Sequence, residues 1–128
     1  MIVGTGTDII ETERVRALFK ANSERFLSRW FDAQEIAYCT GKAQPHLHLA
    51  ARLAAKEATF KALRLSNHAP LCWKDIVIGR EEDGAPRLVL HGAPLAAADK
   101  LGVTGFHLSL SHSDAYAVAT VIAEHDDY

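Results

Sequence analysis

The stretch RLAAKEATFKAL, residues 52–63, constrains the fold most, because it predicts a helix that is buried on nearly every side. At about 100° per residue, large apolar side chains fall on one arc of this helix and alanines on the opposite arc. The first arc holds Leu49, Leu53, Phe60 and Leu63, and the second holds Ala51, Ala54, Ala55, Ala58 and Ala62. Arg52 and Lys56 nevertheless lie within or beside the large apolar arc. Because desolvating an unpaired ion costs several kcal/mol, each must have a partner, a ligand or a route to water.

The elements around this helix predict an α+β fold in a single domain spanning residues 1–128, with a largely antiparallel sheet packed against the long central helix. Hydrophobic periodicity, capping residues and an Asp-Gly turn set the expected bounds. The chain is expected to begin with a strand over residues 1–10, followed by three short helices that start at Glu11, at Asn22 or Ser23, and at Asp32. The long helix follows over about residues 46–65. After it come strands over 75–80 and 86–92, a helix over 94–101, and strands over 106–112 and 116–123. The tail from Glu124 is expected to fray.

Composition excludes several classes of partner. The 128 residues are 48% hydrophobic and carry a net charge of -2, so no global attraction to nucleic acid or to an anionic membrane is expected. No stretch approaches the roughly 20 apolar residues of a membrane span. Cys39 and Cys72 lack zinc-ligand spacing and suit two reduced thiols. We therefore expect a soluble, cytoplasmic protein whose anion sites are local.

Asp8 and Glu57 are the first candidate functional pair. Asp8 ends the first strand and Glu57 lies on the long helix, so the two carboxylates meet only if that helix crosses the end of the strand. Two carboxylates with open positions suit Mg²⁺ when a substrate supplies phosphate oxygens. The alternative is structural: Asp8 caps the following helix and Glu57 pairs with Lys61 four residues later.

A basic set on the same helix, Arg52, Lys56 and Lys61, suggests phosphate groups. Arg binds phosphate bidentately and Lys acts as a point charge. The alternative is that their long stems extend from a partly buried helix to water. His112, at a strand end, can act as a base, a phosphate donor or a metal ligand, although a lone histidine in a turn is more often structural.

Glycine-rich GTGTD, residues 4–8, is only superficially a phosphate loop. It lacks the Lys and Ser or Thr of a Walker motif and has no complete GxGxxG pattern. Gly4 and Gly6 are better explained by close backbone packing beside the site. The chain also has no GxSxG elbow for nucleophilic catalysis.

Taken together, four blocks of the chain resemble the holo-acyl-carrier-protein synthase family of phosphopantetheinyl transferases. They are GTGTDIIETERV at the start, RLAAKEATFKAL in the middle, DGAPRLVLHG after it, and HLSLSHSDAYAVATVIAE at the end. The match covers essentially the whole chain. It implies the 4'-phosphopantetheinyl transferase fold and transfer of the 4'-phosphopantetheine arm of coenzyme A to a serine of an apo acyl carrier protein, in support of fatty acid biosynthesis. It also implies a homotrimer with each active site between neighbouring subunits.

The resemblance implies a role for each candidate residue. Asp8 and Glu57 match the ligands of Mg²⁺, and Lys61 matches a lysine that neutralises charge on the phosphates. Arg52, Lys56 and His112 match positions that help to hold coenzyme A. Glu57 is our hypothesis for the general base that takes the serine proton, directly or through a metal-bound water.

Docking of the acidic carrier protein is expected on the first helix, where Arg14 matches the family position. Four further basic residues on the first two expected helices are possible additions without motif support: Arg16, Lys20, Arg25 and Arg29.

The chain departs from the family pattern at two places. The family usually follows its Lys-Glu-Ala helix with a Gly-Thr-Gly loop, whereas this chain has RLSNHAP, and a turn that is often Gly-Lys-Pro is Gly84-Ala85-Pro86 here.

Two other functions compete with the transferase hypothesis. One is a non-catalytic domain that binds coenzyme A or carrier protein, and the other is a Mg²⁺-dependent phosphohydrolase that uses water in place of the serine.

Overall fold

The computed structural model describes residues 1–65 and 72–127. Its elements, in chain order, are β1 (Ile2–Glu11), α1 (Thr12–Ala21), α2 (Ser23–Trp30), α3 (Ala33–Thr40), α4 (Pro45–Ala62), a 3-10 turn η1 (Trp73–Asp75), β2 (Ile76–Arg80), β3 (Pro86–Leu90), α5 (Gly92–Leu101), β4 (Gly105–His112) and β5 (Tyr116–Glu124). All strand pairs are antiparallel, which confirms the expected α+β class.

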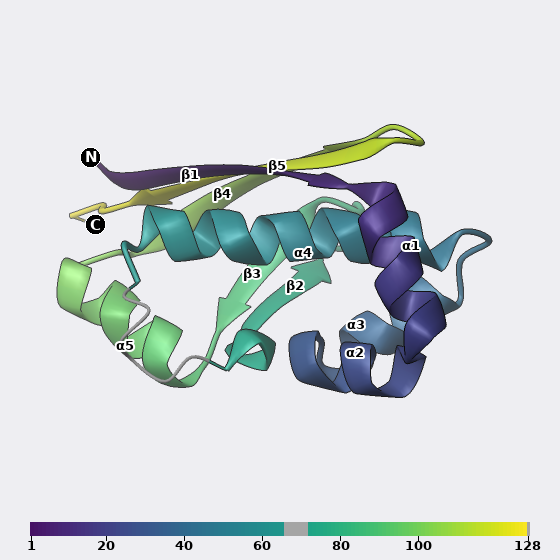
Figure 1. Cartoon of the computed structure of the whole chain (residues 1–128). Helices are drawn as coiled ribbons and strands as arrows, with labels where there is room; N and C mark the ends of the chain where they lie inside the picture. The colour runs from purple at the N-terminus through teal and green to yellow at the C-terminus, as the bar shows by residue number, and fades with distance from the viewer. Residues whose placement is uncertain (66–71, 128) are drawn as a thin grey trace.

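The strands form two sheets that lie against α4, with β3 of one sheet beside β4 of the other (Figure 1). One sheet has the order β1-β5-β4, and the other is the hairpin β2-β3. This arrangement explains why the sequence of α4 is apolar all round: β1 and β5 cover one side, while α1, α3 and β2 pack elsewhere on the helix. In the part of the chain that the structure describes, no helix covers the far face of the three-stranded sheet (Figure 1).

Most helix ends lie where the local sequence predicted them. The side chain of Asn22 accepts a hydrogen bond from the Arg25 amide at the start of α2. Asp32 and Glu35 form a reciprocal capping box at α3. The long helix ends at Ala62, three residues before the expected position, and residues 66–71, which hold the expected stop signal, lie outside the described residues.

The prediction that the tail frays is wrong for residues 124–127, and Tyr128 lies outside the described residues. The amino group of Met1 donates to the His125 carbonyl at 2.8 Å, and the His125 amide donates to the Met1 carbonyl at 2.8 Å. The chain ends are therefore held together beside the sheet. Among the described residues, no helix is both long and apolar enough to cross a membrane.

Close backbone packing explains the glycines of GTGTD, as the sequence suggested. A Cβ atom at Gly4 would lie 2.0 Å from the Ala62 carbonyl oxygen, and one at Gly6 would lie 1.8 Å from the Ala58 carbonyl oxygen. Real Cβ atoms do not approach a backbone oxygen so closely. Only glycine at both positions lets β1 lie directly on α4, and this contact places the end of β1 beside the middle of the helix.

We expect Gly6→Ala to reduce the free energy of unfolding by about 3 kcal/mol or more, because β1 must move away from α4 to admit the methyl group. Gly79→Ala is the matched control, since a Cβ atom there meets nothing closer than 3.9 Å. Urea denaturation of the two variants measures the difference. Equal stabilities would show that the β1–α4 contact does not require glycine.

Candidate active site

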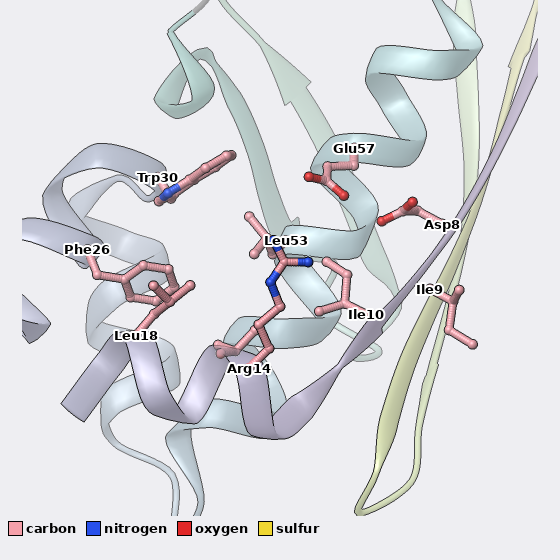
Figure 2. A pocket seen from close by; sticks show the side chains of 10 residues that line it. Asp8, Ile9, Ile10, Arg14, Leu18, Phe26, Trp30, Leu53 and Glu57 are labelled. Carbon is pink, nitrogen blue, oxygen red and sulfur yellow. The ribbon is translucent and has the colours of Figure 1, made fainter. Parts of the chain in front are cut away.

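The end of β1 and the middle of α4 bring Asp8 and Glu57 together, with their carboxyl groups pointing toward one another (Figure 2). Lys61 Nζ donates to Asp8 Oδ1 at 3.1 Å and to the Thr7 carbonyl at 3.0 Å. The structural alternative is therefore wrong. Glu11, and not Asp8, is the N-cap residue of α1, and the ion pair of Lys61 is with Asp8.

The electrostatics of this pair favour a cation. Burial raises the pKa of Glu57 to about 7, assisted by a hydrogen bond that its protonated carboxyl shares with Asp8 and by the Asp8 charge. When Glu57 is ionised, the buried Oδ2 of Asp8 has no hydrogen-bond donor. A buried acceptor without a donor, facing a second carboxylate, is satisfied by a bound metal ion.

The donor set fits Mg²⁺ and a phosphorylated substrate. Within residues 1–65 and 72–127, no three His, Cys, Asp or Glu side chains gather around one point. Two carboxylates hold an octahedral Mg²⁺ ion only when waters and substrate oxygens provide the other ligands, which is the usual arrangement at phosphoryl-transfer sites. Asp8 and Glu57 would be its protein ligands.

Neutralising Asp8 tests this account of the raised pKa. In Asp8→Asn, we expect the pKa of Glu57 to fall from about 7 back toward 4.5, because the like charge is removed while burial remains. NMR titration of the Glu57 carboxyl carbon in chelator measures it. A pKa that stayed near 7 would assign the whole shift to burial.

The raised pKa of Glu57 also makes the folding stability depend on pH. The folded chain holds the Glu57 proton more tightly than the unfolded chain does, so its contribution to stability is full below about pH 4.5 and is lost as the pH rises through about 7. Asp8→Asn should therefore reduce the loss of stability over this range in metal-free protein.

A pocket of about 280 Å³ opens beside the carboxyl pair (Figure 2). The Arg14 guanidinium points into it from α1, and its floor is apolar. The lining residues are Asp8, Ile9, Ile10, Arg14, Val15, Leu18, Phe26, Trp30, Leu53 and Glu57. An adjoining groove between α1 and α2 shares Leu18, Phe26 and Trp30 with this pocket and is flanked by Arg25 and Arg29.

A second group of basic residues surrounds the ring of Tyr38 on α3. The cationic groups lie over the ring, with the Arg52 guanidinium at 4.3 Å from its centroid, the Lys42 ammonium at 4.6 Å and the Arg80 guanidinium at 4.9 Å. Arg52 is only 5% exposed, and its buried Nε has no hydrogen-bond partner. This arrangement leaves positive charge that an anion can satisfy.

Two histidines extend this second group. The ring of His48 lies 6.0 Å from Tyr38 and 5.7 Å from His112 at the end of β4. Sequence reasoning found Arg52 and His112 but missed the other four members, Tyr38, Lys42, His48 and Arg80. Only His48 carried a usable signal, because it precedes Arg52 by one helical turn.

The structure corrects the assignment of Lys56 to the coenzyme A site. Its side chain is 0% exposed, and its ammonium donates to Glu35 Oε1 at 2.8 Å and to the carbonyls of Trp73 and Ile76. Glu35 is 2% exposed and also accepts from the Ile78 amide at 3.2 Å. Lys56 is therefore part of a buried ion pair that joins α3, α4 and β2, and neither the phosphate prediction nor extension to water is correct.

The candidate residues thus form two separate groups. In the part of the chain that the structure describes, no hydrogen bond, ion pair or ring contact joins Asp8, Glu57 or Lys61 to the Tyr38 group. Helix geometry gives the reason: at about 100° per residue, Arg52 points about 140° away from Glu57 and about 180° away from Lys61. The two groups therefore lie on different sides of α4.

Comparison with known proteins shows the family of the chain. The sequence profile of the 4'-phosphopantetheinyl transferase superfamily matches residues 4–121. The chain is 44% identical to a holo-[acyl-carrier-protein] synthase of Koribacter versatilis, over 97% of this chain and 99% of that protein, and 41% identical to one of Geobacter sulfurreducens, over 97% and 98%.

Solved structures agree in fold. The crystal structure of holo-[acyl-carrier-protein] synthase from Neisseria meningitidis superposes with a TM-score of 0.85 at 31% identity, covering 97% of this chain and 99% of that one. The Helicobacter pylori enzyme in complex with coenzyme A superposes with a TM-score of 0.81 at 28% identity, covering 94% and 99%. The chain belongs to the holo-[acyl-carrier-protein] synthases, an enzyme family of the 4'-phosphopantetheinyl transferase superfamily.

Proposed function

We propose that this chain transfers the 4'-phosphopantetheine group of coenzyme A to a serine of an apo acyl carrier protein in a Mg²⁺-dependent reaction. The observation that carries the proposal is the facing carboxyl pair of Asp8 and Glu57, with an unpartnered buried oxygen and Lys61 beside it. Holo acyl carrier protein and adenosine 3',5'-bisphosphate are the products. Modified carrier protein serves fatty acid biosynthesis in the cytoplasm.

The transfer breaks the bond between the bridging pyrophosphate oxygen and the phosphorus that carries the pantetheine arm. The serine oxygen forms the new bond to that phosphorus, and its proton passes to Glu57. The pKa of Glu57 is raised to about 7 in metal-free protein. A bound Mg²⁺ ion would lower it, so Glu57 would be ionised and able to accept a proton near neutral pH. Lys61 is half-exposed and stabilises charge on the departing phosphate, while bound Mg²⁺ supplies further neutralisation of the pyrophosphate.

The Tyr38 group holds the remaining phosphate of coenzyme A in this proposal. Because Arg52 and Lys61 point to opposite sides of α4, one chain does not offer both groups to a single ligand. A homotrimer in which the Tyr38 group of one subunit faces the carboxyl pair of its neighbour supplies both.

An apolar face is available for such assembly. The side of the three-stranded sheet opposite to the face that Gly4 and Gly6 turn toward α4 presents Ile9, 61% exposed, and Tyr116, 50% exposed. Val118 and Ile122 are partly exposed on the same side of β5. Uncovered apolar sheet surface of this kind is typical of a subunit interface.

The groove between α1 and α2 suits an acidic carrier protein. Its floor is apolar, Arg25 and Arg29 flank it, and it leads past Arg14 to the carboxyl pair. A carrier protein on this surface would point its serine at Glu57.

Reversing the charge of Arg14 tests the docking surface. We expect Arg14→Glu to raise the KM for carrier protein about tenfold or more at low salt, with a smaller effect at high salt, because it places like charges together. Arg16→Glu is the matched control, since Arg16 pairs with Glu13 at 3.5 Å and lines neither the groove nor the pocket that Arg14 lines. Equal KM values for the two variants at all salt concentrations would contradict this docking.

Release of adenosine 3',5'-bisphosphate separates the proposed transferase from its competitors. With coenzyme A and Mg²⁺, we expect release only when apo acyl carrier protein is present, and none when its serine is replaced by alanine. Release without carrier protein would indicate a phosphohydrolase. Binding of coenzyme A without release under either condition would indicate a non-catalytic domain.

A further inference from the structure

The Tyr38 group contains a histidine that neither the family resemblance nor the proposed reaction uses. His48 lies on the first turns of α4 and is half-buried, and its ring makes edge-to-face contacts with the rings of Tyr38, at a centroid distance of 6.0 Å, and of His112, at 5.7 Å. The charged and titratable groups that face it are His112 from β4, Arg52 from α4 and Lys42 from the loop after α3. No hydrogen bond or ion pair joins it to a carboxylate within the described residues.

The surroundings of His48 are uniformly basic. Three permanent cations lie within 4.9 Å of the centroid of the Tyr38 ring, and Glu35, a carboxylate that lines the adjoining pocket, is already paired with Lys56. Burial first, and then His112, Arg52 and Lys42, lower the pKa of His48. Without a ligand, a proton on His48 would add a positive charge next to cations that repel it, so the neutral imidazole is favoured.

We propose that His48 is a further ligand-binding residue of the Tyr38 group, and that it takes up one proton from solvent when the phosphates of coenzyme A bind there. This inference rests on the proposed function, which brings coenzyme A to these residues. The negative phosphates offset the repulsion between protonated His48 and the neighbouring cations. The imidazolium form of His48 then becomes favourable and can donate a hydrogen bond to the ligand. No covalent bond changes, and the proton comes from the buffer.

The linkage has a definite sign. A group that binds its proton more tightly in the complex strengthens ligand binding at pH values below the raised pKa, and the gain disappears above it. His48 should therefore strengthen binding of coenzyme A near pH 6.5 and contribute little near pH 8.5. The phosphates of the ligand also titrate, so the effect of His48 is the difference between wild-type and variant protein at each pH.

NMR titration of the histidine rings tests the inference directly. Protein labelled with ¹³C at histidine Cε1 is titrated from about pH 5.5 to 8.5, alone and saturated with coenzyme A, and the His48 signal is assigned by its loss in His48→Gln. We expect the pKa of His48 to rise by about 1 unit or more in the complex. The signal of His91, an exposed residue at the start of α5, should not respond to the ligand and serves as an internal control.

Calorimetry supplies the matched functional readout. His48→Gln should weaken coenzyme A binding severalfold near pH 6.5 and little near pH 8.5, whereas His91→Gln should match wild type at both. If coenzyme A binds with no change in the His48 pKa, or if His48→Gln binds as tightly as wild type at both pH values, the inference is wrong and the proposed function stands. If coenzyme A does not bind wild-type protein at all, the proposed function fails and the inference fails with it.

Discussion

Glu57→Gln is expected to lower the turnover number for carrier-protein modification by about 100-fold or more while leaving the fold intact. Glutamine keeps the size of the side chain but cannot accept the serine proton. It also replaces one of the two carboxylates that face each other at the end of β1. A neutral amide next to Asp8 removes a like-charge contact, so folding stability should not fall.

The measurement is the initial rate of carrier modification at saturating coenzyme A and Mg²⁺, with thermal unfolding as the check on folding. Glu81→Gln, a change in the exposed turn between β2 and β3, is the matched control and should behave as wild type. A Glu57→Gln variant with normal turnover would rule out Glu57 as the general base.

Lys56→Ala is expected to reduce the free energy of unfolding by about 3–5 kcal/mol, because it leaves the Glu35 carboxylate buried without its cation. It also leaves the carbonyls of Trp73 and Ile76 without this donor. Lys61→Ala is the contrasting control. The side chain of Lys61 is 54% exposed, so its removal should cost little stability and much activity.

A double-mutant cycle separates the ion pair from simple loss of packing. Lys56→Met with Glu35→Gln removes both charges and keeps most of the volume, so the double variant should be more stable than the sum of the single changes predicts. Urea denaturation measures all four proteins. If Lys56→Ala unfolded like wild type but lost affinity for coenzyme A, the original assignment of Lys56 to the cofactor site would be correct after all.

Local sequence signals predicted the elements well and the partners of charged residues poorly. The capping box at Asp32 and Glu35 and the Asp-Gly hairpin depend on residues close together in sequence, and both occur in the structure. The capping box did not indicate that Glu35 also forms a buried ion pair. Its side chain was fully explained as a helix cap, so its pairing with Lys56, 21 positions later, had no sequence signal.

The candidate site shows the same limit. Hydrophobic periodicity showed that charged side chains lie within the buried surface of α4. It did not show the direction in which each side chain points or the group that each one contacts. Resemblance to a family joined Asp8 to Glu57, and the structure brings these carboxyl groups together at the β1–α4 contact. Tyr38, Arg80 and His112 come from three different elements, so their grouping with Arg52 required the tertiary fold.

Intact mass of an apo acyl carrier protein, incubated with this protein, coenzyme A and Mg²⁺, tests the central claim most directly. We predict a gain of one phosphopantetheine group, and no gain when chelator is added or when Asp8→Ala replaces the wild-type protein. Unchanged carrier mass across several carrier proteins, despite measurable binding of coenzyme A, would contradict the transferase assignment. A full gain in chelator would contradict the role of Asp8 and Glu57 as metal ligands.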